Sequence, residues 1–413
     1  MSLPGGTIVL RPPRSADFAR WRQIRLLDQR LIEPYWGTSP LGWRARHSER
    51  VWVREFLDAV VYTRLGRRLA LVIEVDGCFA GQIELTAIDR RTRSAEMGFW
   101  LDSVRARRGV STVAAGMLID FALEQLGLER IVAPISTDNA PVLRGAAVCG
   151  MVREATMARY FDVGGERRDH ELWVATVAAA PPGGYAARTV EKYAGMDADP
   201  VERLVALEPE RAPGPATLAA GVVRFALGWL RRRLRRLRRG THELITSGVR
   251  PDVVLRSRTL ADVCRPAVPK EHSMIHELTT QLRGWSGLTS DPGLILVIER
   301  AGVPVGQARL YGLDRFNRSA RVHLHLAVPD PDGDIGATAL RALIDTAFER
   351  FGVLRLSMTA PAGAPATAAA AVRAGMASEG ILREIVGPGG RRGDHELWAV
   401  TVEAGARQRS VPA

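Results

Sequence analysis

A glycine-containing turn stands directly before a helical stretch, and its position suits the binding of an anion. Residues 112–126 carry apolar side chains at helical spacing and end at Gly127, which predicts a helix. The first backbone N–H groups of a helix have no partner within it and lie at the positive end of its dipole, so they can hold a phosphate. The residues of this predicted anion site are Arg107, Arg108, Gly109, Val110, Ser111 and Thr112.

An arginine cluster is the second chemically distinctive segment. Seven of the nine residues from Arg231 to Arg239 are arginine, more than half of the net charge of +12. Before it, Leu218, Val222 and Trp229 belong to the apolar side of a predicted helix over 217–240. Three interpretations fit: a helix on anionic lipid, a contact with RNA phosphates, or a solvated or acid-paired helix that bridges two parts of the chain.

The histidines and cysteines do not predict a metal site. His272 and His276 are four residues apart, and His323 and His325 share one face of a predicted strand, spacings that can bind zinc. The sequence contains no HExxH motif, however, and its three cysteines form no CxxC pair. Surface or core histidines explain the pattern better, so we expect no metal.

The elements that must position these residues occur twice. Residues 77–177 align with 302–402 without a gap, and 32 of the 101 positions are identical. The two segments end in RRDHELWVATV and RRGDHELWAVTV. Upstream, LRPPRSAD pairs with LRSRTLAD, and the second copy is about 20 residues shorter near its start. The sequence therefore predicts a tandem duplication with copies near 7–178 and 252–403.

Each copy alternates strands with helices. In the first, we predict a hairpin over Leu69–Asp89 around Asp76-Gly77, a strand over Ser94–Leu101 and, after the helix, a strand over Arg130–Ser136. A short helix over 141–150 and a closing strand at HELWVATV follow. This is an α/β layer fold. We predict three regions: a domain at 1–178, a linker with a basic amphipathic helix at 179–250, and a domain at 251–413.

Composition places the chain among globular proteins of a reducing compartment. Of its 413 residues 46% are hydrophobic and 25% charged, and no apolar run approaches the roughly 18 residues of a spanning helix. The start lacks the pattern of a secretory signal, and Cys78, Cys149 and Cys264 are widely separated. We expect a cytoplasmic protein, or one peripheral at the membrane if the arginine helix binds lipid.

The first copy resembles the GNAT superfamily of N-acetyltransferases, in particular its RimJ/RimL-type branch of ribosomal-protein acetyltransferases. Seven pieces carry the resemblance in the family's order: LRPPRSADFARW, GQIEL, AEMGFWL, RRGVSTVAAGMLIDFAL, LERIVAPISTDNAP, CGMVREA and RDHELWVATV. The second copy is recognisable mainly through the first. The resemblance implies two tandem GNAT-type domains, each a mixed, mostly antiparallel sheet with packed helices, joined by the partly helical basic linker.

The resemblance implies acetyl-CoA as co-substrate. Its pyrophosphate would lie on the predicted anion site, and its pantetheine would run beside the backbone of Phe99, Trp100 and Leu101. Asn139 matches an asparagine of the family, although a turn role at 138–141 fits it as well. The family usually has glycine where Arg107 stands, so this arginine either adds charge to the diphosphate site or crowds the turn.

Acetyl transfer to an amine requires that the ammonium lose a proton, which a nearby carboxylate can relay. By resemblance, Glu96 stands where the family frequently has glutamate, and Asp162, in the loop before the closing strand, is a second candidate. Either is otherwise a solvated charge at a strand edge. Val142 replaces the branch's frequent serine, which leaves Tyr160 as the nearest phenol for an acid.

The region before the hairpin lines the acceptor side in the family. Glu33, Tyr35 and Trp36 are therefore predicted substrate-binding residues, and the second copy has lost part of this region. Glu33 suits a cationic amine, or else it is simply a charge at a helix end.

The second copy departs from the motif at each position that matters. At the constant offset Asp334 replaces Gly109, Arg321 replaces Glu96 and Ala364 replaces Asn139. Asp330, Asp332 and Asp334 crowd the turn and would repel a diphosphate, and no arginine stands in the turn to offset them. We expect a non-catalytic second domain.

These patterns predict an N-acetyltransferase that moves an acetyl group from acetyl-CoA to a primary amine, either a protein N-terminus or a small molecule. The alternative is a non-enzymatic acyl-CoA-binding scaffold or sensor, held at a membrane or RNA surface by the arginine helix. Turnover that depends on Glu96 or Asp162 distinguishes the enzyme from the scaffold.

Overall fold

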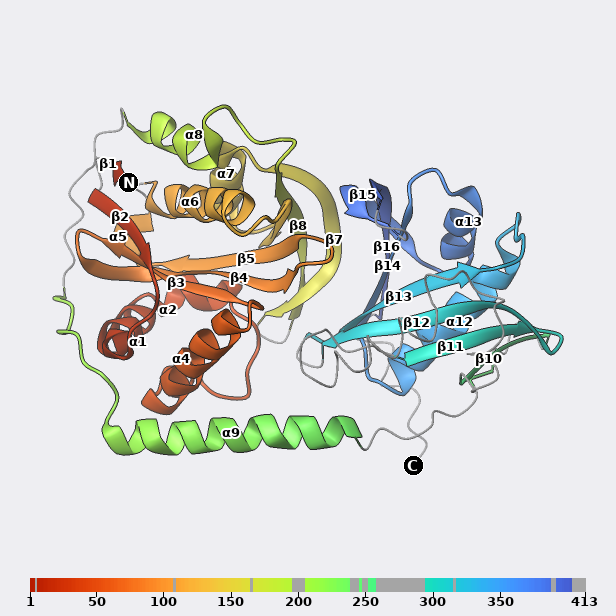
Figure 1. The fold of residues 1–413 in the computed structure, drawn as a ribbon, viewed down its shortest axis with the longest axis horizontal. Helices are drawn as coiled ribbons and strands as arrows, with labels where there is room; N and C mark the ends of the chain where they lie inside the picture. The colour runs from red at the N-terminus through yellow and green to blue at the C-terminus, as the bar shows by residue number, and fades with distance from the viewer. Residues whose placement is uncertain are drawn as a thin grey trace. The chain divides into compact units, whose positions relative to one another are not determined.

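The computed structural model describes residues 1–3, 6–106, 109–163, 166–194, 205–237, 245–246, 252–257, 294–314, 317–387 and 391–402 (Figure 1). The chain divides into two compact units. The first comprises Met1–Glu154 with Phe161–Arg232, and the second Ala155–Tyr160 with Arg233–Ala413. Arg107, Arg108, His272 and His276 lie outside the described residues, and so do Arg238 and Arg239.

The first unit is built on a mixed sheet. Its strands follow the order β1-β2-β3-β4-β5-β6-β8-β7. Neighbours from β1 to β5 are antiparallel, as are β6 and β8, whereas β5 and β6 run parallel. The strands are β1 (Ser2–Leu3), β2 (Gly6–Arg11), β3 (Leu69–Val75), β4 (Cys78–Asp89), β5 (Ser94–Leu101), β6 (Arg130–Ser136), β7 (Val152–Val163) and β8 (Glu166–Thr176).

Helices cover both faces of this sheet. One face packs against α6 (Val110–Glu124), α7 (Ala140–Cys149) and α8 (Gly184–Tyr193) around a core that includes Leu118 and Ile131. The other face packs against helices from the segment between β2 and β3, around a core rich in tryptophan (Figure 1). These are η1 (Ser15–Asp17), α1 (Phe18–Leu27), α2 (Gln29–Ile32), η2 (Glu33–Tyr35), α3 (Trp43–Arg46) and α4 (Glu49–Arg64). Two further helices are α5 (Ser103–Ala106) and α9 (Pro215–Leu237).

The local signals of the sequence explain much of this order. Asp76 and Gly77 both have positive φ, 48° and 72°, which is the two-residue turn that a twisted hairpin requires, and β3 and β4 flank it as predicted. The bounds of β5 and β6 also match the prediction. The helix predicted to begin at Thr112 begins two residues earlier, after Gly109.

One strand was missing from the prediction. Residues 152–163 form β7, so Asp162 lies within a strand and not in a loop before the last strand. Buried and exposed side chains do not alternate regularly along β7, because most residues of its second half are half-buried. The period-2 pattern that identifies a strand is therefore weak there.

The second unit has the same succession of strands. Its order is β15-β16-β14-β13-β12-β11-β10-β9, and β13 and β14 are the parallel pair. The strands are β9 (Ile245–Thr246), β10 (Val253–Ser257), β11 (Leu294–Arg300), β12 (Val303–Asp314), β13 (Ser319–Leu326), β14 (Arg355–Pro361), β15 (Ala377–Val386) and β16 (Arg392–Thr401). The helices α12 (Asp334–Glu349) and α13 (Pro365–Arg373) pack on this sheet. The tandem duplication and the domain boundaries stay predictions from the sequence.

Candidate functional site

The central feature of the first unit is a divergence between β5 and β6. The two strands pair only from Ser94 to Glu96, whereas β5 continues to pair with β4 as far as Leu101. From Met97 onward, therefore, β5 has its ladder neighbour on one side only, and we call the other side, where its backbone groups have no ladder partner, the slot. Such groups can bind an extended polar chain as an added strand would.

Successive side chains of β5 point to opposite faces of the sheet. Ala95, Met97 and Leu101 belong to the core beneath α6, so Glu96 and Trp100 point to the opposite face. Gly98 lies between them, and a Cβ built on it would meet no atom within 4 Å. The half-buried carboxylate of Glu96 thus lies next to open space along its own strand.

The predicted anion site forms at the start of α6. Gly109 is the N-cap residue with φ +73°, and the first helical hydrogen bond runs from the N–H of Val113 to its carbonyl. The N–H groups of Val110, Ser111 and Thr112 belong to the first turn, where a helix offers no internal acceptor. A Cβ on Gly109 would lie 2.6 Å from the ring of Tyr193 at the end of α8, so only glycine fits both the φ and the space.

A buried cation organises the face that carries Glu96. The Arg25 guanidinium carbon lies 4.5 to 4.7 Å from the ring centroids of Trp21, Trp36 and Trp100. Its Nη2 donates to Gln82 Oε1 at 3.1 Å, and the same oxygen accepts the indole N–H of Trp100 at 3.0 Å. Arg25 therefore ties α1 to β4 and β5 beside the slot. Trp100 itself packs in this cluster.

Burial shifts the acid–base behaviour of this cluster. Desolvation lowers the pKa of Arg25 to about 10, although the carboxylate of Glu55, 3.7 Å away, favours the charged form. Burial raises the pKa of Glu55, a rise that Arg25 partly offsets. His47 is held neutral, because burial and then the charge of Arg25 lower its pKa to about 4.

The predicted acceptor residues lie at the edge of the slot face. The hydroxyl of Tyr35 donates to the carbonyl of Asp138 at 3.4 Å, and Trp36 packs on Arg25. Glu33 accepts a hydrogen bond from Gln29 at 2.6 Å within the same helical segment. The contact of Tyr35 with Asp138 places η2 directly beside the turn between β6 and α7.

Asp162 and Asn139 approach this segment from two sides. Thr38 donates its hydroxyl to the Asp162 carboxylate and its N–H to the Asp162 carbonyl at 3.1 Å. Asn139 is the N-cap of α7, but its side chain makes no capping hydrogen bond. Tyr160 lies in the part of β7 that groups with the second unit, and its role as an acid stays a prediction.

Two residues of this site were missed by sequence reasoning. Sequence reasoning gave Arg25 no role, since nothing in the sequence shows that three tryptophans converge on it. The hydroxyl of Ser136, at the end of β6, is buried without a hydrogen-bond partner among the described residues. Its only sequence signal was a small polar residue that closes an apolar strand.

The helix start in the second unit corrects one expectation. The N-cap of α12 is Gly333, with φ +72°, so Gly333 and not Asp334 is the counterpart of Gly109. The carboxylate of Asp330 accepts the N–H groups of Ile335 and Gly336 at 3.2 and 2.9 Å. An internal carboxylate thus already occupies this helix start.

An arginine also neutralises part of the acidic turn. Arg373 of α13, which lies outside the turn, forms an ion pair with Asp334. α13 covers the turn closely, since a Cβ on Gly333 would lie 2.7 Å from the carbonyl oxygen of Ala366.

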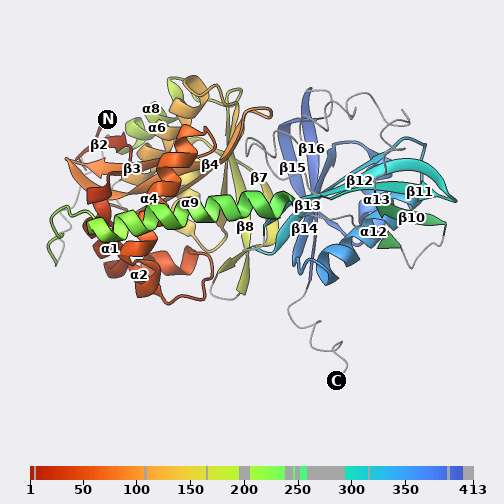
Figure 2. The same ribbon diagram turned by 60° about the horizontal axis from the view of Figure 1, so that its bottom comes forward.

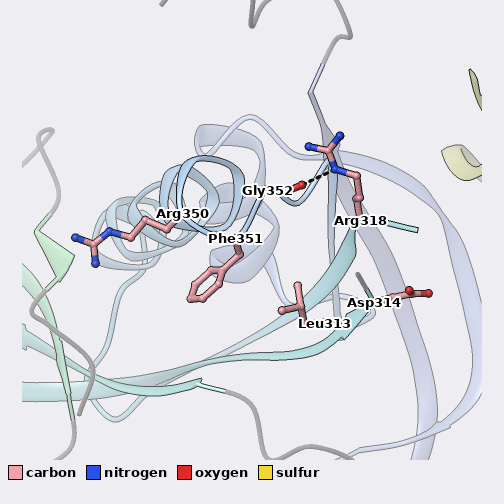
Figure 3. Close-up of a pocket in the computed structure, with 6 residues that line it drawn as sticks. All are labelled: Leu313, Asp314, Arg318, Arg350, Phe351 and Gly352. Carbon is pink, nitrogen blue, oxygen red and sulfur yellow. Dashed lines mark hydrogen bonds between the residues drawn. The ribbon is translucent and has the colours of Figure 1, made fainter. Parts of the chain in front are cut away.

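A surface hollow of about 410 Å³ lies elsewhere in the second unit (Figure 3). Its lining includes Leu313, Asp314, Arg318 and Phe351. The Asp314 carboxylate binds the backbone and side-chain amides of Asn317, and Arg318 donates to the carbonyl of Gly352. The hollow lies at the end of β13 where this strand pairs with β14. The two strands stop pairing after Val322, toward the other end of β13. We assign it no chemistry.

No group of three or more His, Cys, Asp or Glu side chains stands close enough to hold a metal ion within the part of the chain that the structure describes. None of the described helices is both long and apolar enough to cross a membrane.

Comparisons with known proteins match the first unit. Residues 7–152 match the model of the Acetyltransferase (GNAT) domain. RimJ of Mycobacterium smegmatis, solved in complex with CoA-disulfide, is 34% identical over 46% of this chain and 92% of that one, with a TM-score of 0.45. Spermidine N(1)-acetyltransferase of Escherichia coli (strain K12) is 24% identical over 40% of this chain and 82% of its own length. YdaF of Bacillus subtilis is 34% identical over 64 residues, so the chain spans about a third (35%) of that relative.

Proposed function

The chain belongs to the GNAT family of acetyltransferases, and we propose that its first unit transfers an acetyl group from acetyl-CoA to a primary amine. The observation that carries this proposal is the divergence of β5 from β6 beside the glycine-capped start of α6. One feature offers backbone groups to an extended chain, and the other offers N–H groups to a diphosphate. Acetyl-CoA contains both an extended pantetheine chain and a diphosphate.

The cofactor would lie along the slot with its pyrophosphate on the first turn of α6. There the amides of Val110, Ser111 and Thr112 would bind phosphate oxygens, and the backbone of Phe99, Trp100 and Leu101 would bind the pantetheine. Arg107 and Arg108 precede this turn in the sequence and would add positive charge. Asn139, at the start of α7 and not engaged in capping, would contact the cofactor from the β6 side.

Acetyl transfer then needs one proton relay on the slot face. The amine loses a proton to Glu96, directly or through water, and attacks the thioester carbonyl. The C–N bond forms, the C–S bond breaks, and CoA leaves as a thiolate. The nitrogen releases its second proton to water, and the thiolate takes a proton from water. The open space at Gly98 supports Glu96 in this role, because an amine can approach the carboxylate there. Asp162, already engaged with Thr38, is the second candidate for the relay.

The acceptor would enter beside η2, where Glu33, Tyr35 and Trp36 line the approach. Glu33, Glu55 and Glu96 give this face carboxylates that suit a cationic amine. Both a protein N-terminus and a small amine fit this description. One of the named relatives is a spermidine acetyltransferase, and another is a RimJ protein.

The second unit would not catalyse. Asp330 holds the amides that a pyrophosphate would need, and α13 closes over Gly333. In addition, Arg321 stands where the first unit has Glu96. We propose that this unit has a structural or substrate-shaping role.

The test is turnover of Glu96→Gln against a matched control. With acetyl-CoA and a panel of amines, we expect Glu96→Gln to lower kcat about 100-fold while acetyl-CoA binding persists, because only the proton relay is lost. Arg321→Gln, at the matching position of the second unit, should leave kcat unchanged. Equal turnover by Glu96→Gln and the wild type would transfer the role to Asp162, tested by Asp162→Asn. Tight acetyl-CoA binding without turnover of any amine would favour the scaffold.

A further inference from the structure

The helix α9 has one face that belongs to the first unit. Glu49 of α4 accepts hydrogen bonds from the N–H of Gly214 and, at 3.3 Å, from the hydroxyl of Thr217. A Cβ on Gly221 would lie 2.3 Å from Val53, so the two helices touch closely there. Figures 1 and 2 show α9 as a long helix beside α4 on the outside of the unit. Its N-terminal half is thus fixed in place.

The other face of α9 carries apolar side chains that nothing covers among the described residues. Val222, Val223, Leu227 and Leu230 are 53, 58, 48 and 47% exposed, and we call these four residues the outer stripe. At about 100° per residue they fall within an arc of roughly 140°, so they form one continuous band. Single exposed apolar residues are ordinary, but a continuous band marks an interaction surface.

Positive charge continues directly from this band along the same helix. Five of the seven residues 231–237 are arginine, and no residue of α9 is acidic. Arg224 and Arg231 are exposed and lie close to one edge of the outer stripe by helical spacing. Leu234 and Leu237 continue the apolar spacing in the sequence.

We propose that α9 docks the first unit on an anionic lipid surface, with the outer stripe among the acyl chains and the arginines at the headgroups. A lipid surface satisfies both features of the helix, because it is apolar below and negatively charged above. RNA would satisfy the arginines but leave the outer stripe in water. A second copy of the helix would cover the stripe but bring no negative charge to the arginines, because α9 has no acidic residue. This docking is independent of acetyl transfer.

The experiment is co-sedimentation of the full chain with lipid vesicles. Vesicles of phosphatidylglycerol and phosphatidylcholine are compared with pure phosphatidylcholine, at low and at high salt. We expect the chain to sediment with the anionic vesicles at low salt and to be largely released at about 0.5 M salt. Val223→Glu should weaken vesicle binding about tenfold, because it removes apolar contact and adds a repelled charge.

The control is Val372→Glu. Val372 lies on α13 and is 60% exposed, so this change matches Val223→Glu in residue, exposure, helical context and net charge. It should leave vesicle binding unchanged, and circular dichroism should show both variants folded. The proposal is overturned by an absence of sedimentation, by equal binding to both kinds of vesicle, or by full binding of Val223→Glu. Retained binding of that variant to single-stranded RNA, without vesicle binding by the wild type, would assign the surface to nucleic acid.

Discussion

His47 is buried in a place where a second positive charge is unfavourable. It is 1% exposed, and its ring donates from Nδ1 to the carbonyl of Trp43 at 2.7 Å, which places a proton on Nδ1. The guanidinium of Arg25 belongs to the same aromatic cluster and opposes protonation. A charged imidazole here would lose water on all sides and gain no carboxylate in return.

The stability of the first unit should therefore fall as the solution becomes acidic. The unfolded chain binds a proton at His47 near pH 6.5, whereas the folded chain binds it only near pH 4. Between these values the unfolded state holds more protons, so the free energy of unfolding decreases as pH falls, by at most about 3 kcal/mol. His47→Gln should remove this slope.

The measurement is urea unfolding of the wild type and His47→Gln at intervals from pH 7 to pH 4. Carboxylates also titrate in this range, so the quantity to compare is the difference between the two proteins. A difference that does not change with pH would show that His47 carries no such shift.

Among the site residues, backbone roles were predictable and side-chain environments were not. A glycine before a helical run is a strong local signal, and Gly109 takes the left-handed conformation that this signal predicts. Nothing local indicates that Trp100 turns toward Trp21 and Arg25, because those residues lie about 75 positions away in the chain. Ser136 was missed for the same reason.

A carboxylate of α6 caps the start of α8. Asp120 accepts the N–H groups of Tyr185 and Ala186, both at 2.8 Å, and so caps the start of α8 from the neighbouring helix. At the other end of α8, Tyr193 covers Gly109. The start of α6 is therefore linked to Asp120 through the whole length of α8.

Asp120→Ala should loosen α8. Two buried donors would lose their acceptor, which costs about 1–3 kcal/mol, and Tm should fall accordingly. Hydrogen exchange at residues 184–193 should accelerate. Asp345→Ala is the control, since Asp345 holds the same position in the second copy and is exposed. Equal losses of Tm in both variants would contradict the capping role of Asp120.

Elements with a strong period were predictable, and those set by tertiary contacts were not. β5, β6 and the hairpin of β3 and β4 have clear alternation or turn residues, and α6 has a clear apolar spacing. Neither a clear period nor turn residues mark the second half of β7 or the short helices α2, α3 and η2. Their conformation depends on contacts such as those of Thr38 with Asp162 and of Trp43 with the carbonyl of Arg25.

At the scale of the whole molecule, two units with one succession of strands differ at the helix start that would hold a diphosphate. In the first unit the amides of Val110 to Thr112 follow Gly109 at the start of α6. In the second unit Asp330 binds the corresponding amides itself. The internal repeat predicted a common architecture, but only the structure shows which carboxylate occupies the second helix start.

This difference predicts one acetyl-CoA per chain. In a calorimetric titration of the intact chain we expect a single site, because a diphosphate at α12 would have to displace Asp330 from two hydrogen bonds against the repulsion of Asp332 and Asp334. Gly109→Glu should abolish binding, since its side chain would both collide with Tyr193 and bring a carboxylate to the start of α6. Asp330→Asn keeps an acceptor at α12 and should leave the stoichiometry at one. Two sites in the wild type would mean that Asp330 yields to a diphosphate and that the second unit binds the cofactor as well.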